Sequence, residues 1–235
     1  MKLAVTSLAA ERGGRAVFDG VSFAAEAGTL LRVTGANGAG KTTLLRILAG
    51  LAAPAAGEVQ WRAEDATLAP AQAASYVGHA NAFNDALTVR ENLAYAAALA
   101  GRDDSRQGIE SALTALGVRN LLNRRFGTLS QGQRKRASLA RLLAGGAGGG
   151  AAPRAWLLDE PFVALDVDTQ AQLAAVIGAR LAAGGLVIYT SHQAVDIAAA
   201  RTQELALRAC ALQPVPYFAA RCSSSPGARA TGQIR

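Results

Sequence analysis

The sequence predicts an α/β fold with a mostly parallel, doubly wound sheet, because short apolar, β-prone runs alternate with longer helical patterns. A second observation is the phosphate-binding pattern G-x-x-x-x-G-K-[ST] at residues 35–42, which lies between an apolar strand and an apolar helix. The third is a stretch of helical patterns without a convincing strand, residues 84–144. Together they predict a nucleotide-binding α/β core with an inserted all-helical subdomain.

Seven short apolar runs are the candidate strands. In chain order they are residues 3–5, 30–34, 58–61, 75–78, 155–159, 186–190 and 204–207. Three amphipathic patterns are the candidate helices of the insertion, and they are residues 88–100, 105–116 and 132–144. Outside the insertion, strand and helix patterns alternate, which favours parallel strands.

This order divides the chain into three parts. The α/β core comprises residues 1–83 and 145–207, and the helical subdomain comprises residues 84–144. Residues 208–235 form a basic tail with several prolines and a serine run, a composition typical of poorly ordered chain. The glycine-rich residues 145–153 have the composition of a flexible connector.

Size and composition limit the possible classes of protein. A chain of 235 residues that is 51% hydrophobic can form one large domain or two small ones, and it lacks the run of about 18 apolar residues that a membrane-spanning helix needs. The apolar N-terminus runs directly into Glu11 and Arg12, so we interpret it as a strand and not as a signal peptide. Cys210 and Cys222 lie in the tail without a nearby histidine, which excludes a zinc site and a C-x-x-C redox motif.

The net charge of +7 suggests nucleic acid or an anionic membrane surface as a partner. However, residues 205–235 contain four arginines and no acidic residue, so this segment supplies four of the seven charges. The three charges that remain are ordinary for a cytosolic domain. The charge therefore gives little support to nucleic-acid binding.

The phosphate-binding loop predicts a nucleoside triphosphate site. Its glycines let backbone N–H groups point inward around anionic oxygens at a helix N-terminus, whereas a simple glycine-rich turn would need no flanking strand and helix. We expect Lys41 to reach the β- and γ-phosphates and Thr42 to ligate Mg²⁺. The predicted nucleotide-binding residues here are Gly35, Ala36, Asn37, Gly38, Ala39, Gly40, Lys41, Thr42 and Thr43.

An apolar run that ends in two acids, Asp159 and Glu160, follows the loop along the chain. In a phosphate-loop enzyme the first carboxylate suits Mg²⁺, and the second can orient or deprotonate the attacking water. Standing alone, such a pair would more often cap a helix or strand. Its place downstream of a phosphate loop favours the catalytic interpretation.

Two further segments are candidates for contact with phosphate. Residues 129–133, Leu-Ser-Gln-Gly-Gln, open a helix that Ser130 can cap, and a helix N-terminus of this kind suits either a γ-phosphate or a plain surface cap. The segment belongs to the helical insertion, so a second copy packed head-to-tail would be needed to present it to the nucleotide. His192 follows the strand at 186–190, at the edge where α/β sheets bind ligands.

Taken in order, five motifs resemble those of the ATP-binding cassette (ABC) ATPases. They are GANGAGKT at 35–42, LSQGQ at 129–133, WLLDEP at 156–161, ALD at 164–166 and SHQ at 191–193. The resemblance implies a P-loop NTPase core that is RecA-like and ABC-type, with a helical signature subdomain. It also implies a homodimer that holds two ATP molecules with Mg²⁺, each between one subunit's phosphate loop and the other's signature segment.

The same resemblance implies roles for individual residues. Glu160 is the catalytic base, His192 senses the γ-phosphate, and Thr42 and Asp159 hold the metal. Asp166 lies in the loop that joins the two sites of the dimer. The signature residues that act in trans are Leu129, Ser130, Gln131, Gly132 and Gln133.

A finer resemblance is to the ATPase subunits of cytochrome c maturation systems. It is carried by residues 78–79, 89–93, 117–119, 127–136 and 156–166. It implies an ATPase of the haem-transporting class, peripheral on the cytoplasmic face of a bacterial inner membrane. Its partner would be a separate multi-helix permease subunit, and no nucleic acid is expected.

Two positions depart from the general cassette pattern. His79 stands where a glutamine usually links Mg²⁺ to the membrane partner, and the cytochrome c maturation subunits look similar to this chain here. The imidazole can bridge to water or metal, or His79 can be a simple turn residue. Arg12 stands where an aromatic side chain usually stacks on adenine, and a guanidinium plane can also stack on a base. We therefore expect Arg12 and His79 at the ATP site.

Three alternative functions remain open from the sequence. The chain could serve another ABC exporter, or it could be a soluble ABC ATPase that acts on nucleic acid or ribosomes. Only the basic tail supports the soluble alternative. A small-molecule kinase is disfavoured, because it would leave residues 129–133 and the Asp159–Glu160 pair without a role.

Overall fold

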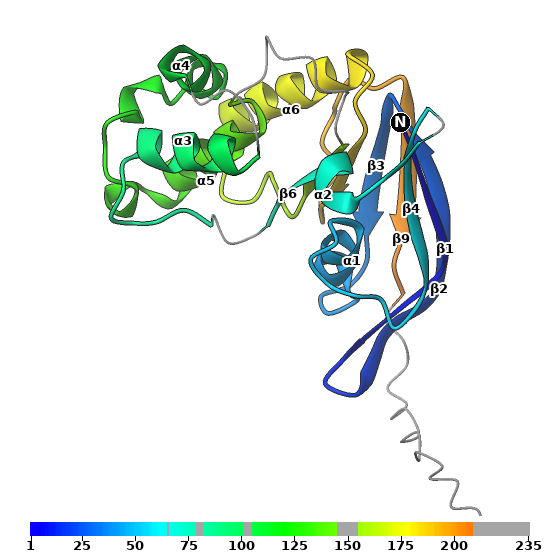
Figure 1. Ribbon diagram of the computed structural model, residues 1–235. Coiled ribbons are helices and arrows are strands. Elements are labelled where there is room, and N and C mark those ends of the chain that lie inside the picture. The colour runs from blue at the N-terminus through cyan, green and yellow to red at the C-terminus, as the bar shows by residue number, and fades with distance from the viewer. Residues whose placement is uncertain (65, 79–81, 101–104, 145–154, 209–235) are drawn as a thin grey trace, which may run out of the picture.

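The strands form two separate sheets in the computed structural model, which describes residues 1–64, 66–78, 82–100, 105–144 and 155–208 (Figure 1). One sheet is antiparallel, in the order β2-β1-β4-β5. Its strands are β1 (Lys2–Arg12), β2 (Arg15–Glu26), β4 (Ala56–Ala63) and β5 (Ala66–Leu68). The other is parallel, in the order β6-β7-β8-β3-β9. Its strands are β6 (Ala74–Val77), β7 (Ala155–Leu158), β8 (Val187–Thr190), β3 (Thr29–Thr34) and β9 (Arg201–Ala206).

The antiparallel sheet corrects part of the predicted strand arrangement. The runs at 3–5 and 58–61 lie in it and not in the parallel sheet, and β2 had not been predicted as a strand. A two-residue turn, Gly13-Gly14, joins β1 to β2, and both glycines have positive φ (58° and 71°). Such a turn leads the chain directly back alongside itself, so the two strands must pair antiparallel.

The helices predicted for the insertion are present and gather on one side of the molecule (Figure 1). They are α3 (Val89–Leu99), α4 (Arg106–Ala115) and α5 (Gln131–Leu139). Short 3₁₀ turns follow α4 and α5, namely η1 (Arg119–Leu121), η2 (Phe126–Thr128) and η3 (Ala140–Leu142). The remaining helices belong to the α/β part: α1 (Lys41–Leu48), α2 (Pro70–Ala73) and α6 (Val167–Ala182). Among the described helices none has the length and apolar character needed to cross a bilayer.

Side-chain caps explain where the helices of the insertion begin. The Thr88 hydroxyl accepts from the N–H of Glu91 at the start of α3, and the Glu91 carboxylate accepts from the N–H of Thr88 in return. This reciprocal arrangement satisfies N–H groups that the first turn of a helix leaves free. Ser130 and Gln133 form the same reciprocal pair at the start of α5, and Ser105 caps α4 by accepting from the N–H of Gly108.

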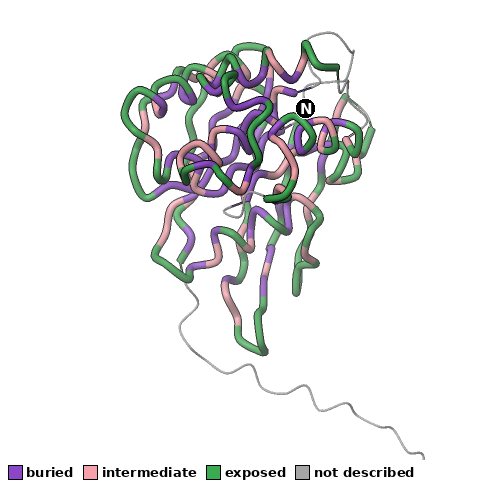
Figure 2. The backbone as a smooth tube through the Cα atoms, turned by 90° about the vertical axis from the view of Figure 1, so that its left-hand side faces the viewer, coloured by how far each residue is buried: buried purple, intermediate pink, exposed green. Residues whose placement is uncertain are grey.

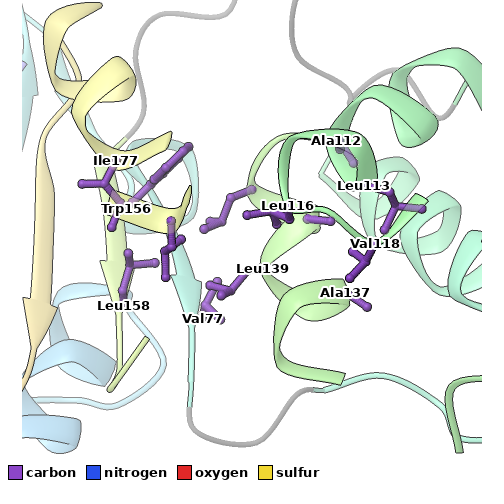
Figure 3. Packing of buried hydrophobic residues seen from close by; sticks show 14 of the residues in the cluster. Val77, Ala112, Leu113, Leu116, Val118, Ala137, Leu139, Trp156, Leu158 and Ile177 are labelled. Atoms are coloured by element: carbon purple, nitrogen blue, oxygen red, sulfur yellow. The ribbon is translucent and has the colours of Figure 1, made fainter. Parts of the chain in front are cut away.

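Two hydrophobic clusters cover the two faces of the parallel sheet. Successive residues of β7 alternate between them, because side chains in a strand point to opposite faces. Trp156 and Leu158 pack with α6 and the helices of the insertion, where Ile177 and Leu139 lie (Figure 3). Leu157 packs with α1 and the antiparallel sheet. Burial on both faces is the reason β7 is apolar throughout, and Figure 2 shows buried residues running through the middle of the molecule.

Candidate nucleotide-binding and catalytic site

Strand order brings distant motifs to one edge of the parallel sheet. β7, β8 and β3 are direct neighbours, and all three run in the same direction. Their carboxyl ends lead into the Asp159–Glu160 pair, into Ser191-His192, and into the phosphate loop at 35–42. Ligands bind at this edge in open α/β sheets. The structure therefore assembles the three predicted segments from parts of the chain that are far apart in sequence.

The phosphate loop curls around the Lys41 side chain. The Lys41 ammonium is buried and donates hydrogen bonds to the carbonyl oxygens of Gly35 at 2.8 Å and Ala36 at 3.1 Å. These two bonds hold the positive charge inside the loop, next to the N-terminus of α1. A charge in this position is suited to an anionic group that enters the same loop.

Gly40 shapes the start of α1 in two ways. It is the N-cap residue and has a left-handed backbone (φ 95°), and because glycine has no side chain the first turn of α1 receives no side-chain cap. A Cβ at this position would also lie 2.5 Å from Val17 Cγ1 and 2.7 Å from Phe18 Cδ1 on β2. Only glycine fits there, and the uncapped N–H groups of α1 are left to bind an anion.

Thr42 and Asp159 form the set of oxygen donors predicted for a metal. The Thr42 hydroxyl donates to Asp159 Oδ2 at 2.8 Å, although the two residues belong to different elements. Asp159 is buried, and its backbone N–H donates to Val77 O at 2.8 Å, which fixes the carboxylate at the end of β7. One hydroxyl and one carboxylate suit Mg²⁺, which completes its octahedron with phosphate oxygens and water. The donor set therefore fits this ion, although no cluster of three metal-binding side chains occurs among the described residues.

Glu160 has an unusual backbone and a histidine beside it. Its φ of 48° is left-handed, a conformation that costs free energy for a residue with a Cβ and that is concentrated at functional sites. His192 Nε2 lies 3.4 Å from Glu160 Oε1, and both side chains are partly exposed. They line one cavity of about 310 Å³ together with residues of the 162–165 segment. The predicted base and the predicted phosphate sensor thus face the same space.

Thr190 connects the two acids and was not predicted. This threonine is fully buried at the end of β8, and its hydroxyl donates to Asp159 Oδ1 at 2.8 Å. The Thr190 hydroxyl oxygen also accepts a 2.8 Å hydrogen bond from the backbone N–H of Glu160. One hydroxyl therefore orients the Asp159 carboxylate and stabilises the strained Glu160 backbone.

Replacing Thr190 with valine keeps the shape but removes both hydrogen bonds. We expect the variant to lose about 1–3 kcal/mol of unfolding free energy, because the Glu160 N–H becomes a buried donor without an acceptor. We also expect slower ATP turnover, because both acids lose their support. Chemical denaturation and a steady-state ATPase assay measure the two effects, and Thr190→Ser is the matched control that keeps the hydroxyl. Wild-type stability and turnover in Thr190→Val would contradict this role.

The structure places residues 129–133 at the start of α5, among the helices of the insertion and away from α1 (Figure 1). Ser130 caps α5 through the N–H of Gln133 at 3.3 Å, and Gln133 Oε1 accepts from the N–H of Ser130 at 3.1 Å. Ser130 and Gln131 are exposed. The fold does not bring this segment to the phosphate loop of its own chain.

Asp166 caps the helix that follows the acid pair. Its carboxylate accepts from the backbone N–H of Thr169 at 2.8 Å, at the first turn of α6. This hydrogen bond holds the pKa of Asp166 below its ordinary value. The residue itself is exposed, so capping leaves it accessible at the surface.

Of the two residues that depart from the general cassette pattern, the structure describes Arg12 but not His79. Arg12 is the last residue of β1, exposed at the hairpin turn and opposite Arg15. The side chains of Val17 and Phe18, on the second strand of this hairpin, lie next to Gly40 of the phosphate loop. His79 lies outside the described residues, as do the connector at 145–153 and the tail beyond Arg208.

Comparison with known proteins decides the family. Residues 18–163, more than half of the chain, match the family described as ABC transporter. This chain belongs to the ABC transporter family. The predicted resemblance to ABC ATPases is confirmed, and the chain is an ATP-binding, ATP-hydrolysing transporter subunit by family.

Relatives of this ABC chain share a more specific name. It is 44% identical over 195 residues to the cytochrome c biogenesis ATP-binding export protein CcmA of Cupriavidus necator, covering 81% of this chain and 82% of the relative. It is 43% identical over 213 residues to the protein of the same name from Albidiferax ferrireducens, covering 88% and 97%. The finer resemblance seen in the sequence is thereby confirmed.

A solved structure confirms the fold class. A putative ABC transporter ATP-binding protein from Pyrococcus furiosus superposes with a TM-score of 0.71 at 24% identity, covering 88% of this chain and 98% of that one. A second structure, the ATP-binding subunit of an ABC transporter, has a TM-score of 0.69 and 23% identity. The predicted α/β fold with its parallel sheet and helices is correct.

Proposed function

We propose that this ABC subunit hydrolyses ATP for a cytochrome c biogenesis export complex, in which it energises a separate membrane permease. The observation that carries the proposal is the meeting of three groups at adjacent strand ends: Lys41 in its loop, the Thr42–Asp159 pair, and Glu160 beside His192. Each group matches one requirement of phosphoryl transfer, namely phosphate binding, metal binding and activation of water. The CcmA name of the relatives supports the choice of complex.

The residues divide the chemical work as follows. The loop N–H groups and Lys41 bind the β- and γ-phosphates, and Thr42 and Asp159 hold Mg²⁺, which when bound neutralises charge on the phosphate oxygens. Glu160 orients the attacking water and accepts its proton, and His192 contacts the γ-phosphate from the neighbouring strand end. The short distance between His192 and Glu160 supports these roles, because both must reach one reacting group.

The nucleotide site is completed by a second copy of the chain. Residues 129–133 present an exposed helix N-terminus, and the phosphate loop of the same chain does not face it. A head-to-tail homodimer would supply this segment to the partner's nucleotide, with Asp166 between the two sites. In this arrangement residues 84–144 act as the signature subdomain, and residues 1–83 and 145–207 form the core.

We place the complex at the cytoplasmic face of a bacterial inner membrane, with this chain as its peripheral subunit. Arg12 and His79 remain candidates for contact with the nucleotide. Arg12 lies at a hairpin turn, and Val17 and Phe18 of the same hairpin lie next to Gly40 of the phosphate loop. In this arrangement the Arg12 guanidinium stacks on the base.

The experiment that tests the function deletes the gene in the bacterium that carries it. The expected result is loss of haem-containing c-type cytochromes on a haem-stained gel, with recovery by the wild-type gene and none by the Glu160→Gln gene. The detergent-solubilised complex should also contain a multi-helix membrane protein that co-purifies with this chain. Normal c-type cytochromes in the deletion strain would overturn the cytochrome c assignment while leaving the ATPase assignment intact.

A further inference from the structure

Arg134, in the first half of α5, directs its side chain back toward the segment that precedes this helix. Its Nε donates to the carbonyl oxygen of Leu129 at 3.1 Å, and its Nη2 donates to that of Gly127 at 2.5 Å. Hydrogen bonds from a charged donor are stronger than those between neutral groups. Arg134 therefore holds two backbone carbonyl groups at the entrance of α5, and one of them belongs to the first residue of the signature segment.

Gly127 is held from both sides. Its N–H donates to the carbonyl oxygen of Asp85 at 3.0 Å, while its own carbonyl accepts from Arg134. A Cβ on Gly127 would lie 2.9 Å from the same Asp85 oxygen, so the two backbones are in contact. Beside it, the Phe126 ring packs edge-on against Phe83 at 5.1 Å between centroids, and the Arg134 guanidinium lies 5.6 Å from the centre of the Phe126 ring. The chain that enters α5 is therefore clamped between Arg134 and a neighbouring segment.

The carbonyl contacts of Arg134 constrain this region more than its ion pair does. Arg134 Nη1 lies 3.7 Å from Asp85 Oδ1, and the Asp85 side chain is 66% exposed. An ion pair of this length contributes little to stability in water. The two carbonyl contacts are shorter and end on the backbone, so they are the main link between Arg134 and the signature segment.

One peptide plane at the start of α5 is fixed at both of its ends. The peptide group between Leu129 and Ser130 has its C=O bonded to Arg134 Nε at 3.1 Å and its N–H bonded to Gln133 Oε1 at 3.1 Å. Because a peptide group is planar, two such bonds leave it little freedom to rotate. The first N–H groups of α5 follow directly and have no partner within the helix. Their direction therefore depends on a plane that Arg134 holds.

We propose that Arg134 is a positioning residue that fixes the Leu129–Ser130 peptide plane, so that the N-terminus of α5 has its binding shape before the partner's ATP arrives. The inference rests on the proposed function, in which residues 129–133 contact the nucleotide of a second copy. α5 begins away from the phosphate loop of its own chain (Figure 1). Loss of Arg134 thus weakens closure of the ATP-bound dimer and leaves the first binding of ATP to one copy unchanged.

The test measures these two steps separately in the full chain carrying Glu160→Gln, which preserves bound ATP. Arg134→Met removes both donors and nearly keeps the length of the side chain. With ATP and Mg²⁺, we expect the dimer dissociation constant in analytical ultracentrifugation to rise by about tenfold or more, the effect of losing one charge-assisted hydrogen bond. In dilute, monomeric protein the affinity for a fluorescent ATP analogue should stay within about twofold, because the phosphate loop is unchanged.

Two further variants in the same background are controls. Arg119→Met removes another arginine of the helical subdomain, whose guanidinium donates to the Glu110 carboxylate at 2.6 Å. Asp85→Asn removes only the long ion pair of Arg134 and keeps the backbone contact with Gly127. Both should leave the dimer dissociation constant within about twofold of the parent.

Three results would overturn the inference. The first is an unchanged dimer dissociation constant in Arg134→Met. The second is equal weakening of the dimer in Arg119→Met, and the third is weaker binding of the ATP analogue by monomeric Arg134→Met, which would show a defect in its own site. If Arg134→Met does not fold, Arg134→Gln takes its place and is judged by the same results. A Glu160→Gln protein that stays monomeric with Arg134 intact would instead contradict the head-to-tail dimer of the proposed function, so the two failures are distinguishable.

Discussion

Replacing Glu160 with glutamine is expected to lower ATP turnover by about two orders of magnitude or more while ATP still binds. Glutamine keeps the size of the side chain and the contact with His192 but cannot accept a proton from water. The loop that binds phosphate and the Thr42–Asp159 pair are unchanged. Steady-state phosphate release and nucleotide binding, measured on the same sample, separate the two effects.

The control for this variant is Glu64→Gln. Glu64 also has a left-handed backbone, with φ 52°, and is exposed, so it matches Glu160 in local strain but lies in the antiparallel sheet region. Its replacement should leave turnover unchanged. Wild-type turnover in Glu160→Gln would show that another residue activates the water.

The same variant tests the homodimer. Slow hydrolysis preserves bound ATP, so Glu160→Gln with ATP and Mg²⁺ should elute from a sizing column as a dimer, and without nucleotide as a monomer. Exposed Ser130 and Gln131 are the surface that the partner's nucleotide would contact. A strictly monomeric Glu160→Gln protein at high concentration would contradict the head-to-tail arrangement.

Replacing Lys41 with alanine is expected to weaken ATP binding by about tenfold to a hundredfold, the value of one or two charge-assisted hydrogen bonds. The variant loses the positive charge that lies inside the phosphate loop. The carbonyl groups of Gly35 and Ala36 also lose their donor, so the loop itself becomes less ordered. Titration with a fluorescent ATP analogue measures the dissociation constant.

Lys2→Ala is the control for Lys41→Ala, because Lys2 is exposed, pairs with Glu26 and is not one of the predicted site residues. It should bind the analogue as the wild type does. Unchanged affinity in Lys41→Ala would mean that the loop binds phosphate through its backbone alone. The melting temperature of both variants should be recorded, since Lys41 is buried and its loss also affects stability.

The parts of the fold that the sequence predicted are those with a strong local pattern. The three helices of the insertion have regular apolar spacing and polar caps at Thr88, Ser105 and Ser130, and they lie within two residues of the predicted starts. The third ends earlier than predicted, because its last turn continues as the 3₁₀ turn η3. The strands β3, β7 and β8 of the parallel sheet are largely buried on both faces and were also found. The edge strand β9 is mostly exposed, and the predicted run at 204–207 covers only its second half.

The antiparallel sheet was missed for a physical reason. β2 contains Asp19-Gly20 in its middle, a pair that reads as a turn, and it is only partly buried. β2 stays extended because it pairs with β1. This pairing is a contact between two strands, so the local sequence of neither strand predicts it.

In the candidate site, sequence motifs located the phosphate loop and the Asp159–Glu160 pair, but not Thr190, which holds both acids by hydrogen bonds. Thr190 is a buried threonine in a strand, and nothing in its sequence context distinguishes it from a structural residue. The position of Arg12 depends on where the hairpin turns, which the sequence did not show.

The two clusters on either side of the parallel sheet each contain one of the chain's two tryptophans. Trp156 lies under the Arg180 guanidinium, 5.3 Å from ring centroid to carbon, and Trp61 donates its indole N–H to Leu48 O at 2.9 Å. Fluorescence from single-tryptophan variants would therefore report separately on each side of the sheet. Comparing the two signals during denaturation reveals whether the halves of the molecule melt together or one after the other.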